Sequence, residues 1–76
     1  MVLAFILIAT KSGLERDVKK NLLKNSKIKE AHVLYGEYDI IAKAEVDDVT
    51  QLNDFLLDEA RKIQGVERTS TLIIAE

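Results

Sequence analysis

Residues 32–46 read HVLYGEYDIIAKAEV, two apolar runs that meet at a polar turn. Only Gly36 and Glu37 separate the two runs. Glycine tolerates a positive φ at the first position of a two-residue hairpin loop. The stretch therefore predicts a hairpin of two antiparallel strands, residues 28–35 and 38–46.

The segment before this hairpin predicts a strand and then a helix. Residues 2–9 are continuously apolar, a pattern typical of a strand that is buried on both faces. Ser12 and Glu15 have the spacing of a capping box, in which each side chain satisfies a free amide at the start of a helix. Apolar residues then recur every four positions along a helix that is expected to run to about Asn25. They are Leu14, Val18 and Leu22.

The segment after the hairpin repeats this order. Asp48 and Gln51 form a second capping box. The expected buried side of the second helix is Val49, Leu52, Phe55, Leu56 and Ile63. Gly65 is the expected C-terminal end of this helix, and residues 66–75 are the expected fourth strand.

The order of elements is βαββαβ, which predicts an α+β protein with the ferredoxin-like fold. Right-handed crossovers arrange it as a four-stranded antiparallel sheet with two helices on one face. The first and third strands are central in this arrangement. The whole chain, residues 1–76, forms a single domain.

The first strand has large apolar side chains on both sides, whereas the helices cover only one. One side carries Leu3, Phe5 and Leu7, and the other carries Val2, Ala4, Ile6 and Ile8. The sequence leaves open which side meets the helices. Burial of three such side chains contributes on the order of 5–9 kcal/mol, comparable to the stability of a typical domain. The sequence therefore predicts that the sheet packs on the sheet of an identical chain, as in a dimeric α+β barrel.

Composition excludes several classes of function. The chain is 47% hydrophobic and 32% charged, contains no cysteine and carries a net charge of −2. This balance disfavours nucleic-acid binding and indicates a soluble globular domain. The apolar residues 1–9 are too short to cross a bilayer and lack the basic start of a signal peptide. We therefore expect no membrane contact and a cytoplasmic location.

The hairpin turn and the last strand carry the candidate ligand chemistry. Glu37 and Asp39 offer carboxylates for a ligand ammonium group, whereas Thr69 and Thr71 offer hydroxyls for a ligand carboxylate. Together these groups match an amino acid. The alternative is that the turn is merely the polar end of a hairpin, since short motifs often occur by chance.

No catalytic or metal-binding pattern accompanies the turn. His32 is the single histidine, without cysteine or recognisable ligand spacing, so we expect neither a metal nor another cofactor. A strand histidine at a surface or interface is the expected role of His32. The three serines, Ser12, Ser26 and Ser70, have no evident base. The sequence predicts a protein that is not an enzyme.

The stretches YGEYDIIAKAEV and GVERTSTLII, with the helix that follows VDD, resemble the ligand-binding domain of the Lrp/AsnC family of leucine-responsive regulators. The resemblance is to the stand-alone version, the RAM module. The resemblance implies dimers that join into an octamer or a decamer, with amino-acid effectors bound between dimers. It also implies a ligand site at Tyr35, Gly36, Glu37, Tyr38, Asp39, Thr69, Ser70 and Thr71.

The expected function is therefore an amino-acid-sensing oligomeric module for transcription regulation. Full-length family members carry a helix-turn-helix domain ahead of this one, but here Met1 leads directly into the first strand. We therefore expect no direct DNA binding, although the chain can co-assemble with a full-length regulator. The alternatives are a small monooxygenase-like enzyme of the dimeric α+β barrel type and a purely structural adaptor.

Overall fold

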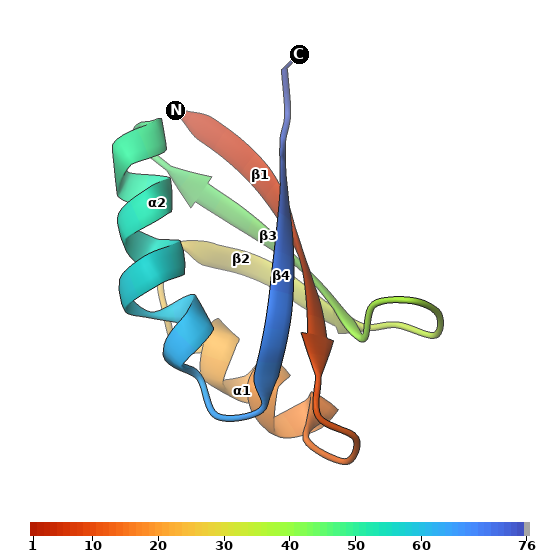
Figure 1. Cartoon of the computed structure of the whole chain (residues 1–76). Helices are drawn as coiled ribbons and strands as arrows, with labels where there is room; N and C mark the ends of the chain where they lie inside the picture. The colour runs from red at the N-terminus through yellow and green to blue at the C-terminus, as the bar shows by residue number, and fades with distance from the viewer. Residues whose placement is uncertain (76) are drawn as a thin grey trace.

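The computed structural model describes residues 1–75 and has the predicted order of elements (Figure 1). The elements are β1 (Val2–Thr10), α1 (Glu15–Leu23), β2 (Ile28–Val33), β3 (Ile40–Val46), α2 (Val49–Asp58), the 3₁₀ helix η1 (Ala60–Lys62) and β4 (Val66–Ile73). The strands form one antiparallel sheet in the order β2-β3-β1-β4. The ferredoxin-like prediction is confirmed, with β1 and β3 in the centre.

Both helices pack on the same face of the sheet, and the core lies beneath them (Figure 1). On β1 the buried side chains facing the helices are Ala4, Ile6 and Ile8. Val18 and Leu22 of α1 are also fully buried. The structure thus answers the question that the sequence left open: Leu3, Phe5 and Leu7 lie on the uncovered face.

The start of α1 differs from the prediction. The helix begins at Glu15, its N-cap residue is Leu14, and no side chain caps it. Gly13 adopts a φ of +90°, which is incompatible with the first turn of an α-helix. The predicted capping box at Ser12 and Glu15 is therefore wrong.

The start of α2 matches the prediction, but its end does not. Asp48 Oδ1 accepts a hydrogen bond from the Gln51 N–H at 2.8 Å, and Gln51 Oε1 accepts from the Asp47 N–H at 2.8 Å. The helix ends at Asp58 and η1 follows, so Gly65 lies in the turn before β4 and does not end α2. Leu52, Phe55 and Leu56 are buried and Ile63 packs against the core, whereas Val49 is exposed.

The connection between β2 and β3 is longer than predicted. β2 ends at Val33 and β3 begins at Ile40, so residues 34–39 form a loop in place of a two-residue turn. The loop projects away from both helices (Figure 1). The Leu34 N–H donates to the Asp39 carbonyl oxygen at 2.7 Å and closes its base.

The uncovered face of the sheet is divided into two strips. Directly paired residues of antiparallel strands share a face. Phe5 pairs with Leu72 of β4, so β1 and this end of β4 form an apolar strip, whereas Ser70 and Arg68 make the other end of β4 polar. Glu30 of β2 pairs with Lys43 of β3, so a charged strip lies beside the apolar strip, although Ile41 of β3 adds one apolar side chain there.

Candidate functional site

The loop of residues 34–39 is fixed to the end of β1 by Asp39. The Asp39 N–H donates to the Ile8 carbonyl oxygen at 2.9 Å. Asp39 Oδ2 accepts from the Thr10 N–H at 2.8 Å. These bonds join the central strand to the loop. A carboxylate that accepts a backbone N–H is held firmly, so the side chain of Asp39 positions the loop.

The tip of the loop points its side chains outward. Tyr35 is fully exposed, with a relative accessible area of 106%, and Glu37 is exposed as well. Gly36 has a φ of +130°, and an added Cβ there meets nothing within 4 Å. The backbone conformation therefore favours glycine at this position, whereas the packing does not require it.

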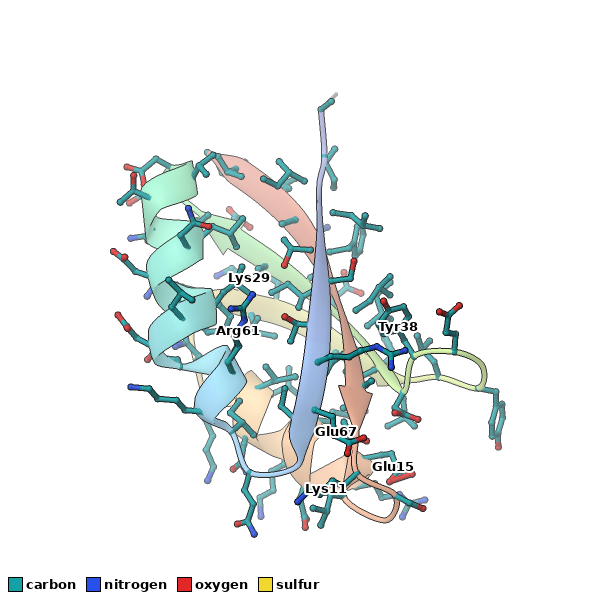
Figure 2. All side chains as sticks on the ribbon, viewed as in Figure 1. Lys11, Glu15, Lys29, Tyr38, Arg61 and Glu67 are labelled. Atoms are coloured by element: carbon teal, nitrogen blue, oxygen red, sulfur yellow. The ribbon has the colours of Figure 1, made fainter. Side chains whose placement is uncertain are left out.

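Tyr38 and Arg68 come together from two distant segments. The guanidinium carbon of Arg68 lies 5.2 Å from the centroid of the Tyr38 ring, within the range of a cation–π contact. Figure 2 shows Tyr38 at the base of the loop, beside the sheet. Arg68 was not among the site residues predicted from the sequence, because only the register of β4 against β1 places it near the loop.

The three hydroxyl residues of β4 do not share one face. Ser70 pairs with Leu7, so it lies on the uncovered face. Thr69 pairs with Ile8, which places it on the helix-covered side. Thr71 pairs with Ile6 and lies on the same side as Thr69. Arg68 pairs with Ala9 and therefore lies on the uncovered face. Of the three hydroxyl residues, only Ser70 shares that face with Arg68.

A hollow of about 340 Å³ lies at the start of β4. It is lined by Arg61, Val66, Glu67, Arg68 and Thr69. Arg61 comes from η1 and Glu67 from β4 (Figure 2). β4 is an edge strand, so the hollow opens along a free edge of the sheet. Charged groups of both signs and a hydroxyl are therefore available to a small polar ligand there.

The side chains of the charged strip contact one another. Glu30 Oε1 lies 3.4 Å from His32 Nε2, and Glu30 Oε2 lies 3.8 Å from Lys43 Nζ. His32 is exposed on β2, as expected for a surface histidine. Exposed pairs of this kind contribute little stability. They do make this side of the uncovered face hydrophilic.

No helix formed by residues 1–75 combines the length and the apolar character that crossing a membrane requires.

Known proteins share both the sequence and the fold. The sequence model described as "Lrp/AsnC ligand binding domain" matches residues 3–76. The HTH-type transcriptional regulator FL11 of Pyrococcus abyssi is 41% identical over 73 residues, covering 96% of this chain and 48% of the regulator. The chain thus spans about half the length of the curated relatives it matches.

Two solved structures are similar over almost their full length. FFRP-DM1 is 46% identical with a TM-score of 0.93, covering 97% of this chain and 99% of that one. The hypothetical protein PHS023 from Pyrococcus horikoshii is 45% identical with a TM-score of 0.94, covering 100% and 92%. The family match, the regulator and the shared fold agree. The chain belongs to the Lrp/AsnC ligand binding domain family.

Proposed function

We propose that this chain is a non-catalytic sensing module that binds amino-acid effectors between copies of itself. The observation that carries the proposal is the uncovered face of the sheet. Its apolar strip includes Leu3, Phe5 and Leu7, which no helix of the same chain covers. Packing against the same strip of a second copy removes this surface from water.

The ligand chemistry lies next to this strip, at the end where the loop is attached. Arg68 supplies a guanidinium for a carboxylate, and Glu37 supplies an exposed carboxylate for an ammonium group. Ser70 and Tyr38 add hydroxyls near the same end. All of these side chains are partly or fully exposed, so one chain offers a single wall of a pocket. A neighbouring copy supplies the other wall.

The predicted residues have different parts in this proposal. Tyr35, Gly36, Glu37 and Tyr38 present the wall, whereas Asp39 holds it in place through the Thr10 amide. Ser70 faces the same side. Thr69 and Thr71 face the helix-covered side of the edge strand β4, away from this wall.

The mechanism is linkage between ligand binding and assembly. A ligand that bridges two dimers stabilises the assembly in which its pocket is complete, by the difference in its affinity for the two states. We propose a homodimer that assembles into an octamer or a decamer, with a full-length regulator as a further partner. The regulatory relatives support this role and a cytoplasmic location.

Calorimetric titration of the chain with each of the twenty amino acids tests the proposal, together with native mass spectrometry. We expect at least one amino acid to bind and to change the distribution of assembly masses. No binding by any of them, with unchanged masses, contradicts the proposal.

Arg68→Gln gives a residue-level test of the wall. Removal of a charge-assisted hydrogen bond to the ligand costs about 1.5–3 kcal/mol, a loss of roughly ten- to a hundredfold in affinity. Lys62→Gln is the control, since Lys62 is also an exposed cation but lies outside the hollow that Arg61 and Arg68 line. Equal losses in both variants contradict the assignment of Arg68.

A further inference from the structure

A groove along α1 combines an apolar floor with cationic groups. It has a volume of about 700 Å³ and is lined by Arg16, Lys19, Lys20, Leu23, His32 and Val33, with no acidic residue among them. Its two apolar side chains, Leu23 and Val33, have relative exposures of 45% and 46%. The groove therefore suits a surface that is both apolar and acidic.

The outer side of α2 has those properties. The helix contains no lysine or arginine, and Asp54 and Asp58 are both exposed. Leu57 has a relative exposure of 55% and follows Asp54 by three positions, so the two side chains lie on the same side of the helix. Val49, at the start of α2, is 48% exposed.

We propose that the α1 groove of one copy binds the outer side of α2 of another copy. The charges are opposite, and both surfaces carry exposed apolar side chains, Leu57 on α2 and Leu23 with Val33 in the groove. In this contact, Lys19 and Lys20 pair with Asp54 and Asp58, and Leu57 enters the groove beside Leu23. This inference extends the proposed assembly and rests on the sheet-paired dimer as its unit.

The contact joins two different patches, so it is heterologous. Each copy that fills a neighbour's groove keeps its own groove free for the next copy, and such contacts continue until a ring closes. Sheet pairing alone ends at the dimer, because it uses the same patch on both copies. The α1–α2 contact therefore supplies the link from dimers to larger assemblies.

Paired charge reversals test the contact. One variant is Lys19→Glu with Lys20→Glu, and the other is Asp54→Lys with Asp58→Lys. Each alone places like charges at every α1–α2 contact, so we expect association above the dimer to weaken by about 10- to 100-fold while the dimer persists. When the two variants are mixed, opposite charges meet again, and native mass spectrometry should show alternating assemblies.

The controls separate this contact from the proposed sensing function. Lys11→Glu with Lys29→Glu reverses two lysines outside the groove and should leave the assembly unchanged. A Phe5→Lys background removes sheet pairing but should retain the α1–α2 association, so loss of one contact is distinguishable from loss of the other. The inference is overturned if both reversed variants assemble as the parent does. It is also overturned if mixing the two variants does not restore association above the dimer. The inference is also overturned if the mixed variants form assemblies larger than the dimer only after a different acidic protein is added.

Discussion

Gly65 is constrained both by its backbone conformation and by its packing. Its φ is +100°, in the left-handed region that side chains disfavour. A Cβ at this position also lies 3.1 Å from Leu14 Cβ and 3.1 Å from Val18 Cγ2. The turn into β4 therefore passes directly against α1, and only a glycine allows that approach.

Gly65→Ala should lower the free energy of unfolding by about 2–4 kcal/mol, the sum of the left-handed strain and of overpacking against α1. Gly13→Ala is the matched control. Gly13 has a φ of +90° but nothing within 4 Å of an added Cβ, so we expect a loss of about 1–2 kcal/mol. Urea unfolding of both variants measures the difference, and equal losses contradict the packing argument.

Asp39 satisfies the Thr10 amide, which lies at the end of the central strand. Thr10 is 7% exposed, so its N–H has little access to water if the carboxylate is lost. The backbone of Asp39 also forms hydrogen bonds with the backbones of Ile8 and Leu34. Asp39 thereby determines where the candidate ligand loop leaves the sheet.

Asp39→Ala should destabilise the fold by about 1.5–3 kcal/mol, because it removes a charge-assisted hydrogen bond from a partly buried amide. Asp39→Asn retains an oxygen acceptor and should lose about half as much. Thermal or urea unfolding compares the two. An alanine variant as stable as the parent contradicts the anchoring role.

The two helices begin in different ways although their starting sequences look alike. Asp48 caps α2 through the Gln51 amide, whereas α1 has no side-chain cap. Gly13 separates the two cases, since its left-handed conformation delays the first turn of α1 until Glu15.

Asp48→Ala should cost about 1 kcal/mol of stability through loss of the N-cap. Ser12→Ala should change stability by no more than about 0.5 kcal/mol, as for an ordinary surface substitution. Urea denaturation of both variants distinguishes them. A large effect at Ser12 shows that the hydroxyl caps α1 after all.

The sequence pattern was sufficient for the order of elements but not for the details of the connections. The continuous apolar run of β1 and the βαββαβ order predicted a sheet with β1 and β3 in its centre, because burial and crossover handedness can be read along the chain. The loop of residues 34–39 was predicted too short, because Asp39 bonds to β1 and this tertiary contact leaves no mark in local sequence. Arg68 was missed for the same reason, since its proximity to Tyr38 depends on strand register.

On the scale of the whole molecule, the face of the sheet that the helices leave uncovered carries large apolar side chains in contact with water. Leu3, Phe5 and Leu7 are only half-buried on β1, and Leu72 of β4 is 54% exposed. A face of this kind in water is a recognised mark of an interaction surface.

Phe5→Lys should abolish sheet pairing and leave the fold intact, because Phe5 points away from the core. Gln64→Lys adds the same charge at an exposed position outside the face and should have no effect. Analytical ultracentrifugation at micromolar concentration gives the masses, and circular dichroism checks the fold. A parent chain that is a folded monomer under these conditions contradicts sheet pairing.

The division of the uncovered face into an apolar and a charged strip also restricts how a second copy can be oriented. A copy turned the other way would bring Glu30 of β2 against Leu72 of β4, and charges buried without suitable partners cost several kcal/mol. Only the rotation that superimposes like strips avoids this desolvation. In the proposed sheet-paired dimer, this distribution of side chains therefore favours one orientation of the second copy over the other.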